Sequence, residues 1–242
     1  LVDRKEMARA FVRAGQLVKA QRAHEARANA AARLGLHTVE ADALSAAAYF
    51  AFRAGAYEDA ENLCGKSMRT ARIHDYPLGI SLAALILAQL EFDLGKTRSA
   101  TRRIQAAVQR ARSVGADDSV VFLRHAQATF AEGLGRHHEA VETFDDLAGH
   151  YAKLSPQDRL RYLIDRGCVR ARLALHTEGD FAPARKDLLE ALAVAEATEH
   201  DSLALALINL AEIEIADGRF EAAAVWLARV DELKKKRPFI EG

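Results

Sequence analysis

Residues 55–60 read Gly55-Ala56-Tyr57-Glu58-Asp59-Ala60, and a glycine followed five residues later by an alanine recurs along the whole chain. The other pairs are Gly15/Ala20, Gly95/Ala100, Gly135/Ala140, Gly179/Ala184 and Gly218/Ala223. Successive glycines are separated by about 40 residues, a period typical of stacked repeats in which each unit buries its apolar face against its neighbours. The period therefore predicts a single repeat domain over residues 1–242.

The composition favours helices between the repeated glycines. Only 4 prolines occur in 242 residues, and no segment shows the alternation of a strand. We expect each repeat to contain a helix A, a tight turn at the glycine, a helix B and a short loop. The predicted fold is all-α, a right-handed α-solenoid of six helix-turn-helix repeats and about twelve helices. The expected repeats span about 1–37, 38–75, 76–116, 117–154, 155–200 and 201–236.

Small residues at helical spacing identify the faces on which helices A and B meet. In the second repeat they are Leu44, Ala47, Ala48 and Ala51 on helix A and Ala60, Leu63, Cys64 and Ser67 on helix B. Small side chains let two helices approach closely, and a glycine readily adopts the left-handed conformation that ends a helix. We therefore expect Ala60, Ala100 and Ala140 to be buried at the helix crossings.

The fifth repeat is four residues longer than the others. A 40-residue register buries Ile164, Gly167, Cys168 and Ala171, whereas a 44-residue register would bury Arg172. We therefore place the extra residues after Ala171, which lengthens helix A by about one turn of 3.6 residues. The segment Ser155-Pro156-Gln157-Asp158 resembles a capping box at the start of this helix.

The repeat resembles the tetratricopeptide repeat (TPR), in a variant of about 40 residues rather than 34. Gly55, Tyr57 and Ala60 match the turn glycine, the aromatic residue and the helix-B alanine of that family. Leu44, Ala47, Ala48 and Cys64 lie at its other packing positions. The chain departs from the family in carrying alanine where large aromatics are common and in lacking most prolines between repeats. The resemblance implies a non-catalytic, protein-binding module that uses a concave groove.

Charge is balanced overall but unevenly distributed. The formal net charge is +0, so bulk attraction to nucleic acid or to an anionic membrane is not expected. The stretch 96–112 is rich in arginine, and the stretch 190–218 carries seven acids and no Lys or Arg. The basic stretch is either a solvated outer face or a dock for an acidic partner, including the 190–218 region of another copy. Arg98, Arg102, Arg103, Arg110 and Arg112 are the residues concerned.

No arrangement of residues indicates catalysis, a metal site or a cofactor. The segment Gly95-Lys96-Thr97 resembles the end of a phosphate-binding loop, but Leu90 stands where that loop needs a glycine. Adjacent residues in His137-His138-Glu139 point about 100° apart on a helix, so they do not converge on one ion. Cys64 and Cys168 lie at apolar positions in different repeats, which favours a reduced, cytoplasmic protein.

The inner faces of the A helices are the predicted site for a protein or peptide partner. When helical hairpins stack with a constant rotation, one set of helices lines a concave surface. The residues projected there are Ser45, Tyr49, Phe52, Leu85, Gln89, Phe92, His125, Thr129, Glu132, Asp165, Val169, Arg172, Ile208, Glu212 and Ile215. Phe52 and Phe92 occupy equivalent positions, where they either fill gaps between A helices or receive an apolar anchor of the partner.

Two functions are compatible with these patterns. One is a passive adaptor that holds a peptide, helix or loop of another protein. The other is a ligand- or peptide-sensing domain of a larger bacterial-type signalling or transcriptional regulator. The chain begins at Leu1 rather than Met, which is consistent with a fragment of a longer protein.

Overall fold

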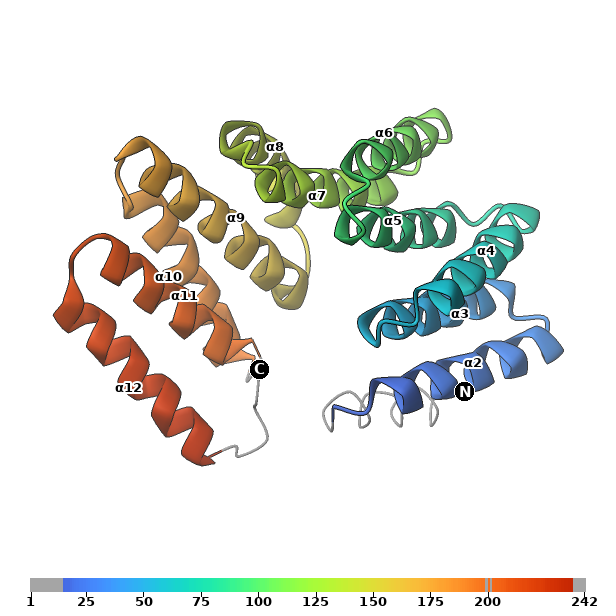
Figure 1. Cartoon of the computed structure of the whole chain (residues 1–242), viewed down its shortest axis with the longest axis horizontal. Helices are drawn as coiled ribbons and strands as arrows, with labels where there is room; N and C mark the ends of the chain where they lie inside the picture. The colour runs from blue at the N-terminus through green and yellow to red at the C-terminus, as the bar shows by residue number, and fades with distance from the viewer. Residues whose placement is uncertain (1–14, 199, 201, 237–242) are drawn as a thin grey trace. The chain divides into compact units, whose positions relative to one another are not determined.

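The computed structural model describes residues 15–198, 200 and 202–236, and every regular element in these ranges is a helix. The helices are α2 (Leu17–Arg33), α3 (His37–Arg53), α4 (Tyr57–Ile73), α5 (Pro77–Asp93), α6 (Thr97–Ser113), α7 (Asp117–Gly133), α8 (His137–Tyr151), α9 (Pro156–Thr177), α10 (Ala182–Ala197), α11 (Leu203–Ala216) and α12 (Phe220–Lys236). Figure 1 shows them as successive antiparallel hairpins. The prediction of an all-α fold is confirmed for the described residues, and the first predicted helix, over residues 1–14, lies outside them.

The chain divides into two compact units, one up to Ala126 and one from Gln127, with the boundary inside α7. Unit 1 contains α2 to α6 and the first part of α7, and unit 2 contains the rest of α7 and α8 to α12. Each unit is built from helices that pack on their neighbours in sequence. Whether the two units stack as one continuous solenoid stays a prediction.

The helices from α2 to α7 are equal in length, and a three-residue linker follows each of them. The middle residue of each linker adopts the left-handed conformation. These middle residues are Gly35, Gly55, Asp75, Gly95, Gly115 and Gly135, with φ between 47° and 78°. The structural period of one helix and one linker is therefore half of the sequence period, because the predicted loop after each helix B has the same length and conformation as the turn after each helix A.

Hydrogen bonds of the Schellman type close these turns. At the Gly55 turn, the Ala56 amide donates to the Ala51 carbonyl at 2.9 Å and the Gly55 amide donates to the Phe52 carbonyl at 3.0 Å. The pattern satisfies carbonyls that would otherwise lack a partner at the helix end. At the end of α9 the left-handed residue is Glu178 (φ 51°) instead of Gly179, and the Gly179 amide donates to the Ala174 carbonyl.

The predicted small-residue faces are buried. Ala47, Ala48 and Ala51 on α3 and Ala60 and Cys64 on α4 are all 0% exposed. Leu44, Leu63 and Ser67 are also buried, and Ala100 and Ala140 occupy equivalent buried positions at the next crossings. The expected packing of helices A and B is confirmed.

The fifth repeat has the longer helix A that the sequence predicts. Helix α9 contains 22 residues, and the loop before it stays short because α8 ends at Tyr151 and α9 begins at Pro156. Of the four residues that the 40-residue register was expected to bury, Ile164 and Gly167 are buried, whereas Cys168 and Ala171 are partly exposed. Arg172 is exposed, which argues against the 44-residue register. Ser155 caps the helix, because its side chain accepts a hydrogen bond from the Asp158 amide at 3.3 Å.

Within each unit the A helices lie closer together than the B helices. Helix α3 contacts α5, and α9 contacts α11. Among the described helices, no corresponding contact joins α2 to α4, α4 to α6, α8 to α10 or α10 to α12. Neighbouring hairpins are therefore tilted so that the A helices line the inner side of each unit, which is the geometry that the site prediction assumes.

Ala100→Leu should destabilise the protein by about 1–3 kcal/mol, because three extra carbons must enter a crossing with no free space. The measurement is the free energy of unfolding by urea. Gln109→Leu, on the exposed face of the same helix, should change stability by less than about 0.5 kcal/mol. Equal stabilities for Ala100→Leu and the parent would show that the crossing is open.

Two glycine-to-alanine substitutions inside helices should act in opposite directions. A Cβ at Gly167 would lie 2.9 Å from Leu188 Cγ, so Gly167→Ala should cost about 1 kcal/mol or more after its gain in helix propensity. At Gly65 the nearest atom is Arg69 Nη1 at 3.6 Å, so Gly65→Ala should stabilise by about 0.5–1 kcal/mol. Thermal and urea unfolding of both variants test the pair, and stabilisation by both would disprove close packing of α9 on α10.

Candidate functional site

The structure divides the fifteen residues of the predicted groove into three classes of exposure. Tyr49, Arg172, Glu212 and Ile215 are exposed, and Leu85, Gln89, Phe92, Thr129, Glu132, Asp165 and Ile208 are partly exposed. Ser45, Phe52, His125 and Val169 are buried. The prediction that all fifteen face solvent is therefore wrong for these four. Binding by the others stays a prediction.

The buried positions result from the close approach of successive A helices. Phe52 is 9% exposed and belongs to the apolar core that also contains Ile86 and Leu90 of α5. It therefore fills the gap between helices, which is one of the two roles expected for it. Ser45 lies beside Ser67, with 2.9 Å between the two side-chain oxygens, and Ser67 donates to the Ala41 carbonyl at 2.8 Å.

The other two corrections concern helices α7 and α9. Val169 is 2% exposed and His125 is 8% exposed. The sequence projection treated each A helix as having a free inner face. Contacts such as those of α3 with α5 and of α9 with α11 cover part of that face, so a residue two turns from the buried stripe can also be buried.

Unit 1 retains a mixed apolar and polar surface on neighbouring A helices. Tyr49 on α3 is 41% exposed, and its hydroxyl accepts a hydrogen bond from Arg53 Nη1 at 2.9 Å. Leu85, Gln89 and Phe92 on α5 are partly exposed, and Gln89 Nε2 donates to Asp93 Oδ1 at 2.9 Å. We call Tyr49, Leu85, Gln89 and Phe92 the A-helix surface of unit 1. It offers two aromatic rings, an aliphatic side chain and an amide to a partner.

The inner side of unit 2 combines ion pairs with an apolar stripe. Arg172 pairs with Glu132, and Arg161 lies 3.6 Å from Asp165. The sequence predicted three groove residues on α11, namely Ile208, Glu212 and Ile215. Leu205 lies on the same side of this helix and is 47% exposed, but it was not predicted. The spacing of three, four and three residues between these four positions is the signal that would have included Leu205.

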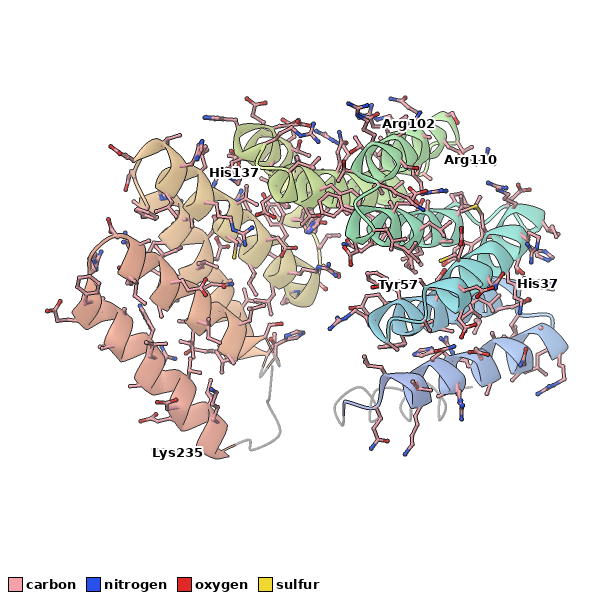
Figure 2. The ribbon with its side chains drawn as sticks, in the orientation of Figure 1. His37, Tyr57, Arg102, Arg110, His137 and Lys235 are labelled. Atoms are coloured by element: carbon pink, nitrogen blue, oxygen red, sulfur yellow. The ribbon has the colours of Figure 1, made fainter. Side chains whose placement is uncertain are left out.

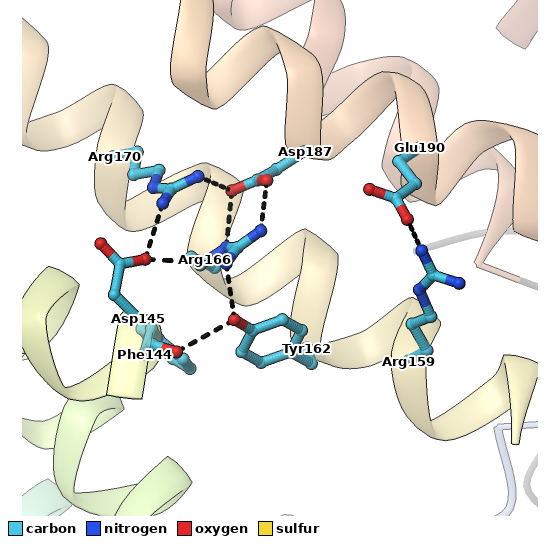
Figure 3. A network of polar contacts seen from close by, with 8 residues as sticks. All are labelled: Phe144, Asp145, Arg159, Tyr162, Arg166, Arg170, Asp187 and Glu190. Carbon is cyan, nitrogen blue, oxygen red and sulfur yellow. Dashed lines mark hydrogen bonds and ion pairs between the residues drawn. The ribbon is translucent and has the colours of Figure 1, made fainter. Parts of the chain in front are cut away.

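A network of charges that is buried at Asp187 and exposed at Asp145 joins α8, α9 and α10 in unit 2 (Figure 3). Asp187 is 1% exposed and receives two hydrogen bonds from Arg166, Nε to Oδ2 at 2.8 Å and Nη2 to Oδ1 at 2.6 Å. Arg170 donates from Nη1 to Asp187 at 2.7 Å and from Nη2 to Asp145 at 2.6 Å. A buried carboxylate that is fully hydrogen-bonded to two guanidinium groups is a structural element, because it leaves no charge available for chemistry.

Aromatic rings support this network. The Tyr162 hydroxyl accepts from Arg166 Nη1 at 2.7 Å and donates to the Phe144 carbonyl at 2.9 Å. The Tyr151 and Tyr162 rings are stacked with their centroids 4.3 Å apart. Burial raises the pKa of Tyr162 in spite of the nearby Arg166, and burial raises the pKa of Tyr151 to about 12. Both phenols stay protonated at neutral pH.

Besides Asp187 on the B helix α10, two carboxylates on A helices each accept two hydrogen bonds from one arginine. Glu91 receives both Nε and Nη2 of Arg103, at 3.1 and 2.6 Å, and these hydrogen bonds hold its pKa below the usual range. Glu214 is 2% exposed and receives Nε and Nη2 of Arg185 at 3.0 and 3.1 Å. Both glutamates lie four residues before a turn glycine, a position that Ala51 and Ala131 occupy elsewhere.

Arginines are neutralised very differently in the two units. Every arginine described in unit 2 forms an ion pair with a carboxylate, namely Arg136, Arg159, Arg161, Arg166, Arg170, Arg172, Arg185, Arg219 and Arg229. On α6, by contrast, only Arg103 has a carboxylate partner among the described residues. Figure 2 shows the Arg102 and Arg110 side chains on α6.

The acidic stretch 190–218 is largely neutralised within its own unit. Glu190 pairs with Arg159, Glu196 with Arg229, and Glu214 and Asp217 with Arg185. Four of its seven acids are therefore engaged, which reduces the charge available for binding the basic stretch of another copy.

One open cavity of about 350 Å³ lies in unit 2 between α8, α9 and the start of α10. Val141, Leu173 and Pro183 provide much of its apolar wall, and Asp145 and Arg170 provide charge. These two charged groups are paired with each other, and Asp180, which also lines the cavity, accepts a hydrogen bond from the Ala182 amide.

Neither thiol is activated. Cys64 and Cys168 are free, and burial raises the pKa of each to about 12. Within the described ranges, no group of three or more His, Cys, Asp or Glu side chains is placed to hold a metal ion. In that same part of the chain, no helix combines the length and the apolar character needed to cross a bilayer.

Solved structures with the same architecture cover most of the chain. BtubC (BKLC) from P. vanneervenii superposes with a TM-score of 0.59 and 20% identity, over 92% of this chain and 92% of that one. The TPR-like repeats of a putative kinesin light chain from Podosopora anserina superpose with a TM-score of 0.62 and 19% identity, over 81% of this chain and 94% of that one. The chain has a TPR-like repeat fold. The predicted resemblance is thus confirmed at the level of fold.

A second structure of the Podosopora anserina repeats gives a TM-score of 0.61 at 19% identity, over 81% of this chain and 96% of that one. No family model and no curated protein sequence matches this chain.

Asp187→Asn should destabilise the protein by on the order of 3 kcal/mol, because it leaves two inward-facing guanidinium groups without their buried counter-charge. Asp145→Asn removes a charge from the same network at a side chain that is 46% exposed, and should cost less than about 1 kcal/mol. Urea unfolding at neutral pH compares the two. Equal small effects would show that the network is solvated.

Proposed function

We propose that the chain is a non-catalytic protein-interaction module that holds a segment of a partner protein against the inner side of its A helices. The observation that carries this proposal is the A-helix surface of unit 1. There, Tyr49 on α3 and Leu85 and Phe92 on α5 remain at least partly exposed, although the two helices are in contact. Partly exposed aromatic residues on adjacent, rigidly packed helices are suited to bind an apolar side chain.

The chemistry of this surface favours a peptide or helix that presents apolar side chains on one side. Tyr49 is held in place by the hydrogen bond from Arg53, so little side-chain entropy would be lost on binding. The Gln89 amide can donate to, or accept from, a backbone amide of the partner. In unit 2, Leu205, Ile208 and Ile215 form a second apolar stripe around Glu212. A partner could use either stripe.

Removal of the aromatic anchors provides the test. A photo-crosslinking amino acid at position 89 identifies the partner in cell extract, and the affinity of the isolated partner is then titrated. Tyr49→Ala and Phe92→Ala should each weaken binding by about 2 kcal/mol, roughly thirtyfold, because anchor residues contribute most of the binding free energy. Thermal unfolding checks that each variant is folded.

The matched control is Asn62, which is exposed on α4. A crosslinker at position 62 should not capture the same partner, and Asn62→Ala should leave its affinity unchanged. Capture from position 62, together with full affinity of the Tyr49 and Phe92 variants, would exclude the A-helix surface as the binding site.

A further inference from the structure

The outer face of α6 carries an isolated row of guanidinium groups. Arg98, Arg102, Arg110 and Arg112 are all exposed, and we call these four residues the arginine face. They lie within an arc of α6 that contains no buried residue, opposite Ala100, Ile104 and Ala111, which face the core. From Arg98 to Arg110 the row extends about 18 Å, at 1.5 Å per residue.

No carboxylate neutralises these groups within the described part of the chain. Residues 96–116 contain six Lys or Arg and no Asp or Glu. Both carboxylate oxygens of the nearby Glu91 accept hydrogen bonds from Arg103, and the Asp93 carboxylate accepts a hydrogen bond from Gln89. The arginine face therefore differs from unit 2, where each described arginine has its own carboxylate. The difference appears in the formal charges, because residues 1–126 carry 19 Lys/Arg and 13 Asp/Glu (+6) and residues 127–242 carry 15 and 21 (−6).

The exposed residues between the arginines indicate the chemistry of a partner. They are Gln105, Ala106 and Gln109, which are polar or small, so the face offers no apolar anchor point. Arg98 and Arg102 are one helical turn apart, which matches carboxylates spaced four residues apart on a second helix. Guanidinium groups bind carboxylates through two parallel hydrogen bonds, as Arg103 does with Glu91.

The same surface is poorly suited to nucleic acid and to a second copy. It has no exposed aromatic ring on which a base could stack. Duplex DNA carries one charge per about 1.7 Å, so the affinity of a protein for it rises with the number of basic side chains that contact phosphates. The arginine face provides only four such side chains. In a second copy, the acidic stretch 190–218 is mostly occupied by arginines of its own unit.

We infer that the arginine face is a second docking surface, separate from the A-helix surface, and that it binds an acidic segment of another protein. The attraction is electrostatic and steers the encounter of the two partners, so it contributes specificity and association rate more than permanent affinity.

The test uses a fluorescein-labelled, alanine-based helical peptide with glutamates four residues apart, and its glutamine counterpart. Fluorescence anisotropy measures their binding to the full chain at low ionic strength. Arg102→Glu/Arg110→Glu should weaken binding of the glutamate peptide about tenfold or more, because attraction becomes repulsion at two positions. Lys66→Glu/Arg72→Glu, on exposed positions of α4, changes the net charge equally and should reduce affinity less than about twofold. The glutamine peptide should not bind.

Several results would overturn the inference. Equal losses in the two double variants would show that binding reflects net charge alone, and no loss in either would place the peptide elsewhere. Tighter binding of a duplex DNA of equal charge, abolished by Arg102→Glu/Arg110→Glu, would assign the face to nucleic acid. A dimer seen by analytical ultracentrifugation and lost in that variant would assign it to a second copy. Tyr49→Ala should not affect binding of the peptide, which keeps this test independent of the proposed function.

Discussion

A left-handed residue closed by Schellman hydrogen bonds sets the geometry of the repeats. It ends each helix from α2 to α7 at the same length and lets the next helix begin after a three-residue linker. Because the amide three positions beyond the helix end donates to a carbonyl inside the last turn, the direction of the following helix is fixed by the backbone. Equal helix lengths then bring the same positions of successive helices opposite one another.

That regular arrangement requires small side chains where helices cross. A carboxylate that lies between packed helices requires an arginine that neutralises its charge. Alanines at 0% exposure occupy the crossings of α3 with α4 and of α5 with α6. Glu91, Asp187 and Glu214 lie in the packed layers instead, and each is matched by an arginine that approaches with two hydrogen bonds. Such pairs are costly to desolvate, but removal of one partner is more costly still, so each pair favours the packing in which both of its partners meet.

The two faces of the hairpins consequently differ in chemistry. The contact between α3 and α5 buries Phe52 and leaves Tyr49, Leu85 and Phe92 at its edge, which produces a surface suited to apolar groups. Within each unit, the described outer helices are not in contact with one another, and their charges are free to differ between repeats. In unit 2 the described arginines form ion pairs with carboxylates of the same unit, whereas four arginines on α6 are exposed to solvent.

The sequence by itself determined the helical repeat, its register and the longer fifth helix A, because turn glycines and buried alanines are local requirements that recur at fixed spacing. It predicted Ala60 and Ala100 in the core and placed the extra turn of α9 after Ala171. It placed a loop at residue 75, between the second and third repeats, but it did not predict the left-handed conformation of Asp75, since an aspartate indicates that conformation less clearly than a glycine does. Only the tertiary structure decided that Phe52, His125 and Val169 are buried and that Asp187 is matched by Arg166 and Arg170. Those outcomes depend on the distance and tilt between helices of different repeats, and one-dimensional spacing carries no information about either.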